Sequence, residues 1–214
     1  MWPRILPFAA YMAFIGMSYL VPSGSGLELW LYPVKILLVL GLLTYFWSSY
    51  QELQQPLYVQ GQETALAVGV GLVVYVLWVR MDWSWAIQGE LTGYNPFQEG
   101  AMLGWGLAAI RLFGAAVVVP VMEELFWRSF LIRWIVNQDF EKVAFGTFTL
   151  GSFAWTVVLF GVEHNLWLAG MMAGVAYNCL WYQTRRLWPC VVAHATTNLL
   201  LGIHVLVTQE WQWW

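Results

Sequence analysis

Long apolar runs separated by short polar breaks dominate the chain. In approximate bounds, the runs cover residues 5–21, 29–47, 64–79, 101–119, 121–136, 143–160, 166–182 and 190–207. Each run approaches the roughly 20 residues that a helix needs to span the hydrocarbon core of a bilayer. Because a backbone in lipid has to satisfy its polar groups internally, the runs are expected to be helices. The pattern predicts an all-α fold, a polytopic transmembrane helical bundle with about seven to eight membrane helices.

The breaks between the runs contain turn-forming or interfacial residues. Residues 22–26 read Pro-Ser-Gly-Ser-Gly, whereas the longest break, residues 82–100, is both aromatic and polar, which suits a membrane interface. We interpret residues 1–214 as a single integral membrane domain. Residues 1–100 would form N-terminal helices and an interfacial loop, and residues 101–207 would form the core that carries the chemistry.

The number of crossings depends on Pro120, because a proline lacks a backbone donor and starts or kinks a helix. If residues 101–136 cross once, as one long kinked element, an internal N-terminus places Arg4, the basic residues of the 133–142 loop and the 185–186 pair on the cytoplasmic side. Two crossings would put the 185–186 pair on the opposite side. We therefore favour an odd number of crossings. The run after Arg4 has no convincing cleavage site and is expected to remain as the first helix.

Composition supports a membrane protein and narrows the partners. Hydrophobic residues make up 60% of the chain and charged residues only 10%, whereas a soluble domain carries about 25% charged residues. This excludes a soluble globular protein and makes the lipid bilayer the first partner. The net charge of −3 is dispersed, with no basic stripe, so no nucleic acid partner is expected.

One apolar run, residues 121–136, contains adjacent carboxylates and a guanidinium. A charge at the centre of a bilayer costs roughly 3 to 10 kcal/mol, so such groups persist mostly where they are paired, hydrated or needed. Glu123 and Glu124 point about 100° apart on a helix. Glu124 and Arg128 stand four residues apart, in the order that favours an ion pair. This pairing leaves Glu123 as the candidate reactive carboxylate, and a purely structural polar network is the alternative.

Two further short patterns lie in the apolar runs that follow. His164 closes one run, with Phe160 one turn earlier on the same face. His194 and Asn198 are again four apart and project from one helix face. A His and an Asn on one face can donate to a developing oxyanion, while a glutamate with a second His can activate water. His204 is interpreted as an interfacial or packing residue.

The order Glu-Glu-x-x-x-Arg, Phe-x-x-x-His and His-x-x-x-Asn resembles the ABI or CPBP family of membrane proteins. This family includes the type II CAAX prenyl endopeptidases and bacteriocin-processing or immunity relatives. The resemblance covers the region from residue 101 to residue 207. The matching residues are Glu123, Glu124, Arg128, Phe160, His164, His194 and Asn198.

The resemblance implies a glutamate-dependent intramembrane endopeptidase with a helical fold. Glu123 and His164 would activate the water that attacks the scissile carbonyl, and His194 and Asn198 would stabilise the tetrahedral intermediate. The supporting residues would be Glu124, Arg128 and Phe160. No cofactor and no metal are expected.

Two other readings remain open. Two histidines and one glutamate are a plausible zinc set, but the chain has no His-Glu-x-x-His spacing, and an Asn beside His194 suits an oxyanion hole better. Some relatives are discussed as immunity or partner-binding proteins, in which the polar cluster binds and does not cut. A transporter is disfavoured, because no inverted repeat is evident.

The resemblance also suggests a substrate class and a location. The expected substrate is a membrane-anchored or lipid-modified peptide, with the prenylated CAAX peptide as the family's type. The short chain is similar to prokaryotic members, so an inner (plasma) membrane location is expected. Some such short proteins accompany exosortase-type protein-sorting systems, which are therefore a further expected partner.

Overall fold

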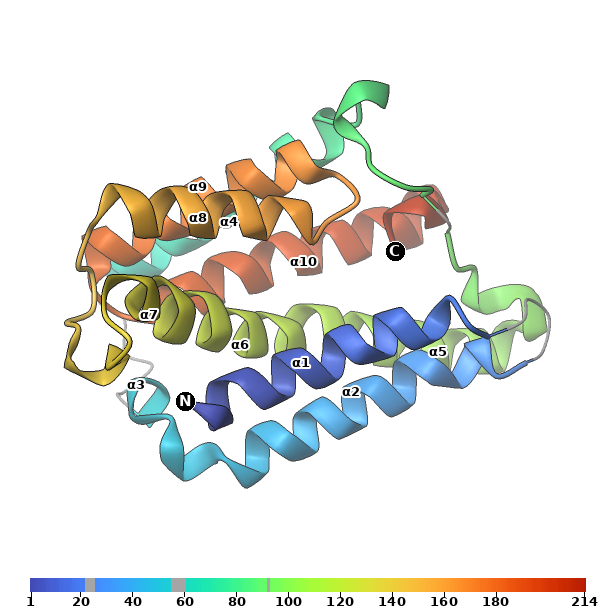
Figure 1. The fold of residues 1–214 in the computed structure, drawn as a ribbon. Coiled ribbons are helices and arrows are strands. Elements are labelled where there is room, and N and C mark those ends of the chain that lie inside the picture. The colour runs from blue at the N-terminus through green and yellow to red at the C-terminus, as the bar shows by residue number, and fades with distance from the viewer. Residues whose placement is uncertain (22–25, 55–60, 92) are drawn as a thin grey trace.

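The computed structural model describes residues 1–21, 26–54, 61–91 and 93–214, and all of the regular structure within these ranges is helical. The all-α fold is thereby confirmed, and its long helices lie side by side as a bundle (Figure 1). Most of the turn predicted at residues 22–26 falls outside the described residues. The α-helices are α1 (Trp2–Ser18), α2 (Glu28–Tyr45), α3 (Gln51–Gln54), α4 (Gly61–Arg80), α5 (Ala101–Phe113), α6 (Val119–Glu124), α7 (Ile132–Val136), α8 (Leu150–Val162), α9 (Trp167–Thr184) and α10 (Trp188–Thr208).

Helices α5, α6 and α7 form one continuous element of 36 residues, Ala101–Val136, which we call the central element. Two π-helical stretches, Gly114–Val118 and Leu125–Leu131, connect its parts. A π turn holds one extra residue, and the first of these stretches ends just before Pro120, where the regular hydrogen-bond ladder has to adjust to the missing donor. The two apolar runs on either side of Pro120 are therefore one element, which is the alternative that the charge pattern favoured.

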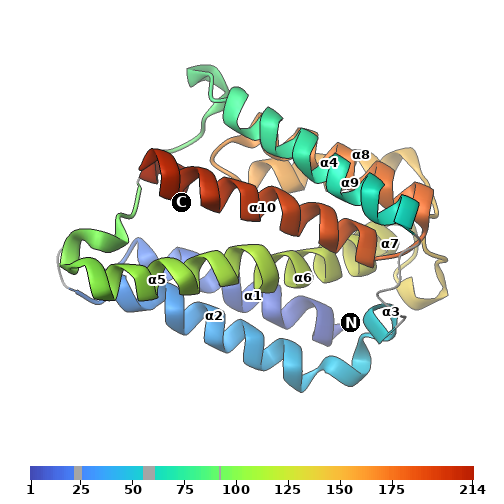
Figure 2. The ribbon, with the colours of Figure 1, turned by 180° about the vertical axis from the view of Figure 1, so that it is seen from behind.

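The central element separates two groups of helices. Helices α1 and α2 pack on each other and against one side of it, and α4, α8, α9 and α10 lie on the other side (Figures 1 and 2). In this second group α10 packs on α4, and α8 packs on α9. The middle of the central element, α6, contacts both α1 and α10. A side chain on α6 can therefore face residues from both halves of the chain.

Four helices in the described part of the chain are long and apolar enough to cross a membrane. They are Glu28–Tyr45, Gly61–Arg80, Ala101–Val136 and Trp188–Thr208. Leu150–Val162 is apolar but, at 13 residues, shorter than a full span. We predicted seven to eight membrane helices. The structure supports these four, and any further crossing stays a prediction.

The basic residues used in the topology argument lie at one end of the bundle. Arg4 donates hydrogen bonds to Glu52 and Ser129, and Arg133 donates to the backbone oxygen of Val143. The loop between α9 and α10 reaches the same end (Figure 1). This is the arrangement expected of a central element that crosses once. Which side of a membrane this end faces stays a prediction.

Helices α8 and α9 approach each other closely through small residues. A Cβ atom built on Gly170 would lie 3.0 Å from the Cα of Gly161 and 3.3 Å from His164 Nδ1. One built on Gly174 would lie 3.3 Å from the Cα of Val157. Small residues allow backbones to approach in this way. The Gly170–Gly174 pair thus brings the end of α8, with His164, against α9.

Candidate active site

A cavity of about 280 Å³ lies where the two halves of the bundle meet, and we call it the catalytic cavity. Its wall includes Glu123 from the central element, His164 from the turn after α8, and His194 and Asn198 from α10. The four residues predicted to be catalytic, which are up to 75 positions apart in the sequence, therefore face one volume.

The predicted ion pair between Glu124 and Arg128 is present and buried. Arg128 Nη1 lies 3.0 Å from Glu124 Oε1, and the two side chains are 1% and 0% exposed. Arg128 Nε also donates to Asn178 Oδ1 at 3.1 Å, and the Asn178 amide donates in turn to Thr156. This chain of hydrogen bonds fixes α6 against α9 and α8, so the pair has a structural role.

His194 is oriented by the same glutamate. Its Nδ1 lies 3.0 Å from Glu124 Oε1, and its ring stacks on Tyr177 with 5.2 Å between the ring centres. A carboxylate acceptor places a proton on Nδ1. The other ring nitrogen, Nε2, then faces the cavity and lies 4.0 Å from Glu123 Oε2.

Glu123 stands outside the Glu124–Arg128 pair, as the helical spacing predicted, and its ion-pair contact is with His194 at 4.0 Å. Its side chain is 8% exposed, and Oε2 accepts no hydrogen bond from any residue that the structure describes. Buried polar groups are rarely left unpaired, so each exception calls for an explanation. A carboxylate kept free inside a cavity is ready to accept a proton from a bound molecule.

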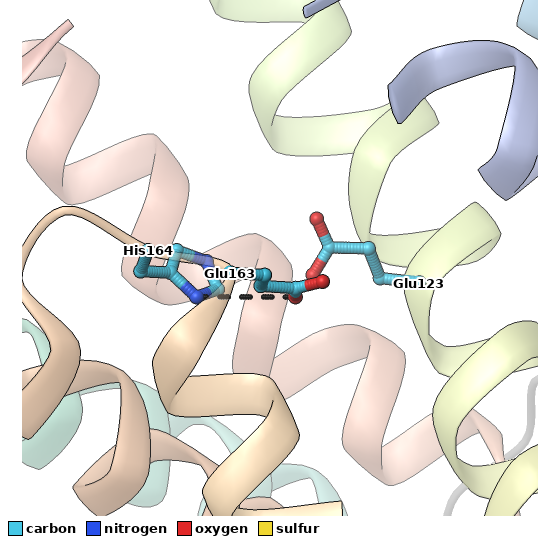
Figure 3. A group of neighbouring side chains, drawn as sticks. All are labelled: Glu123, Glu163 and His164. Carbon is cyan, nitrogen blue, oxygen red and sulfur yellow. Dashed lines mark ion pairs between the residues drawn. The ribbon is translucent and has the colours of Figure 1, made fainter. Parts of the chain in front are cut away.

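Glu163 is a second carboxylate beside Glu123, and the sequence analysis missed it. Ligand atoms of Glu123, Glu163 and His164 all lie within 4.8 Å of one another (Figure 3). Glu163 Oε1 is 3.8 Å from His164 Nδ1 and accepts no hydrogen bond within the described part of the chain. The available signal was its position directly before His164, at the end of an apolar run. A buried and a half-buried carboxylate this close repel each other when both are charged, and a proton or a cation between them relieves that repulsion.

His164 is held by the backbone of its own helix. Its Nδ1 lies 2.7 Å from the backbone oxygen of Phe160, and a carbonyl can only accept, so Nδ1 carries the proton and donates. Nε2 is then the nitrogen with a free lone pair. The Trp78 ring packs edge-on against the imidazole, 5.2 Å between centres. Gln88, from the predicted interfacial loop, donates to the backbone oxygens of Val162 and His164 and so anchors the turn.

Asn198 and Phe160 complete the set of predicted residues. Asn198 Nδ2 donates to the backbone oxygen of Ala115 at 2.8 Å, inside a π-helical stretch of the central element. One amide hydrogen is thereby used and the other remains for a ligand. Phe160 packs between the two site histidines, 5.0 Å and 6.2 Å from their ring centres, and the Arg128 guanidinium carbon lies 4.7 Å from its ring centre.

The possible metal ligands that lie together in the structure differ from the zinc set considered in the sequence analysis. The two-histidine, one-glutamate set is not among the ligand groups formed by residues 1–21, 26–54, 61–91 and 93–214. The group that does form has two glutamates and one histidine. His204 lies outside the cavity, with hydrogen bonds to Tyr75 and Glu210, and contributes to neither set.

Comparison with known proteins gives a family match for the second half of the chain. Residues 105–200 match the family model described as type II CAAX prenyl endopeptidase Rce1-like. The matched region contains every site residue predicted above, and the predicted resemblance is confirmed. No curated protein and no solved structure gives a match. With four apolar helices in its described part and a region that matches this family, the chain is an integral membrane protein, and the match supports a protease activity.

Proposed function

We propose that this chain, which carries an Rce1-like region at residues 105–200, is a glutamate-dependent intramembrane endopeptidase acting on a membrane-anchored or prenylated peptide. The observation that carries the proposal is the Glu123 carboxylate, whose Oε2 accepts no hydrogen bond from the described residues, in a cavity that His164, His194 and Asn198 also line. A prokaryotic inner membrane and an exosortase-type partner stay predictions of the resemblance.

The proposed reaction begins with a water molecule held between Glu123 and His164. Glu123 takes a proton from the water, and His164 Nε2, which has a free lone pair, accepts a hydrogen bond that orients it. The water oxygen bonds to the scissile carbonyl carbon, and the carbonyl electron pair moves onto its oxygen. When this intermediate collapses, the carbon–nitrogen bond breaks and the proton held by Glu123 passes to the leaving amine.

His194 and Asn198 are proposed to stabilise the oxyanion that forms in this step. Asn198 has one amide hydrogen left beyond its bond to Ala115. His194 donates from Nε2 when that nitrogen carries a proton, and the Glu124 carboxylate then serves as the counterion. Such donors act strongly because they are fixed before the charge develops. Glu124 and Arg128 contribute by holding His194 and α6 in place.

A zinc-dependent protease is the second candidate, and one observation favours it. Glu123, Glu163 and His164 offer three ligand atoms within 4.8 Å of one another. Catalytic zinc sites commonly use three protein ligands and keep a fourth position for water. In that case the cation, and not a proton, would balance the two carboxylates.

The test is cleavage of prenylated and unprenylated fluorogenic peptides by the detergent-purified chain, with and without a chelator. Glu123→Gln is compared with Glu141→Gln, a matched change at an exposed glutamate. Cleavage that survives chelation and is lost only in Glu123→Gln supports the metal-free endopeptidase. Loss on chelation, restored by zinc, supports the second candidate. Absence of cleavage for every peptide contradicts both and favours a binding or immunity role.

A further inference from the structure

Two basic side chains near the catalytic cavity form no ion pair within the described residues. Lys35 of α2 is 9% exposed, and its Nζ lies 3.9 Å from the ring centre of Tyr11 and 4.9 Å from that of Tyr32. The guanidinium carbon of Arg111, on α5, lies 4.7 Å from the Tyr32 ring centre. Within the described residues, neither side chain forms an ion pair or donates a hydrogen bond.

Aromatic rings surround these cations but do not neutralise them. Arg111 also faces the rings of Tyr94 and Trp214, at 5.6 Å and 5.5 Å from their centres. A cation over an aromatic face gains about 0.5 to 2 kcal/mol, which recovers only part of the several kcal/mol that removing a charge from water costs. Two neighbouring cations in such a setting also repel each other. An anion placed between them would relieve both effects.

Arg111 lies between the catalytic cavity and a larger space of about 800 Å³, which we call the outer cavity. Arg111, Tyr32 and Trp214 line both cavities, and Lys35 lines the outer one. The carboxylates that line the outer cavity, from residues 28 and 90, are exposed. The buried part of this passage is therefore basic and aromatic.

A short extended peptide could reach from Arg111 to the catalytic groups. Arg111 and Glu123 are twelve residues apart on the central element, which is about 18 Å at the helical rise. Asn198 contacts Ala115, which lies between them. An extended peptide advances about 3.3 Å per residue, so about five residues at most would separate a scissile bond near Glu123 from an anion at Arg111.

We propose that Lys35 and Arg111 bind the C-terminal carboxylate of the peptide substrate and so select cleavage within a few residues of a free C-terminus. The proposal rests on the endopeptidase function proposed above and adds a specificity subsite to it. The Arg111 guanidinium offers two parallel N–H donors, the geometry that a carboxylate accepts. The Lys35 ammonium adds a second positive charge. An internal peptide segment has no anion at a fixed distance from its scissile bond and gains nothing here.

The first experiment compares two farnesylated fluorogenic peptides of one sequence, one ending in a free carboxylate and one in a carboxamide. The wild-type chain is expected to cleave the free acid with a kcat/KM about tenfold or more above that of the amide, the factor that about 1.4 kcal/mol provides. Arg111→Gln and Lys35→Gln lower this ratio towards one, and Arg111→Lys keeps part of it. Arg80→Gln, a matched change at an exposed arginine that ends α4, keeps the full ratio. Equal cleavage of acid and amide by the wild type overturns the proposal.

A binding measurement separates this proposal from the catalytic one. In the Glu123→Gln chain, fluorescence anisotropy reports binding of the same two peptides without turnover. Tighter binding of the free acid, lost on adding Arg111→Gln, supports the subsite even if no peptide is cleaved by the wild type. Equal binding of acid and amide, with displacement of both by phosphatidylglycerol, overturns it and assigns the two cations to a lipid headgroup.

Discussion

Two clusters of charged side chains lie against the central element and differ in how completely their groups are paired. At the N-terminal end of the bundle, Arg4 donates to both carboxylate oxygens of Glu52, each at 2.8 Å, and to Ser129. The Ser129 hydroxyl also donates to Glu52. We call these three residues the basal network. At the catalytic cavity, by contrast, Glu123 Oε2 and the neighbouring Glu163 Oε1 accept no hydrogen bond from the described residues.

The difference separates a structural role from a reactive one. A buried ion pair with all of its hydrogen bonds made holds the elements that carry it, and removing one partner leaves an uncompensated charge. A carboxylate left without donors stabilises nothing in the fold and remains free to bind a proton, a water or a cation. Substitutions should therefore affect stability in the basal network and activity in the cavity.

The largest expected effect is the loss of activity in Glu123→Gln. Because the carboxylate is the proposed proton acceptor, kcat should fall by about 10² to 10⁴-fold. The thermal unfolding midpoint in detergent should not fall, since Oε2 makes no hydrogen bond that the amide would lose. Single-turnover cleavage and differential scanning fluorimetry measure the two quantities. A lower unfolding midpoint in the variant would show that Glu123 has a structural role like that of the basal network.

The opposite behaviour is expected of Glu52→Ala, which removes one partner of the basal network. Arg4 and Ser129 would be left buried without their acceptor, at a cost of about 3 to 5 kcal/mol in the free energy of unfolding. Denaturant unfolding in mixed micelles measures this change, and Glu141→Ala, at an exposed position, is the control. Activity per folded molecule should stay close to that of the wild type. If Glu52→Ala were as stable as the wild type, the basal network would not have the structural role argued for it here.

Asn198→Ala should lower kcat by about 10² to 10³-fold, the usual effect of removing one oxyanion donor. Its KM should change little, because the donor acts mainly on the charge that develops during the reaction. Asn198 also bonds Ala115, so the unfolding midpoint is measured beside the kinetics. Asn137→Ala, at an exposed asparagine, is the matched control. A rise in KM with kcat unchanged would assign Asn198 to ground-state binding.

The smallest effect, and the most discriminating, is expected of Glu163→Gln. Replacing one of two neighbouring unpaired carboxylates by a neutral amide should raise the free energy of unfolding by about 1 kcal/mol. The loss of activity should be smaller than that of Glu123→Gln, because Glu123 would keep the proton-accepting role. Denaturant unfolding with and without added zinc measures the change. Lower stability in the variant, seen only when zinc is present, would show that the pair binds a cation.

Contacts within one helical turn could be predicted because helical geometry alone fixes them. Residues four apart meet on one face, which is why the sequence predicted the Glu124–Arg128 pair. The same geometry put Phe160 and His164 on one face, although the bond there joins the imidazole to a backbone oxygen. Apolar run lengths likewise predicted the helices, since a backbone in lipid has few other ways to satisfy its polar groups.

Contacts between distant segments could not be obtained in this way. Arg4 was interpreted only as a topology signal, yet it pairs with Glu52, 48 positions away. The helices before residue 101 gave no functional signal, yet Lys35 lines the outer cavity next to Arg111 and Tyr32. Glu163 looked like a neighbour of a motif residue until packing of α8 against the central element placed it beside Glu123.

The sequence by itself thus determined the all-α fold, the local pairs and the residues able to carry chemistry. Each of these follows from interactions within one helix or from burial in lipid. Only the tertiary structure decided which carboxylates are paired and which are free, and which cations reach the cavity. The pairing of these charges depends on how helices from both halves of the chain pack around α6. The periodicity within a single helix does not predict that packing.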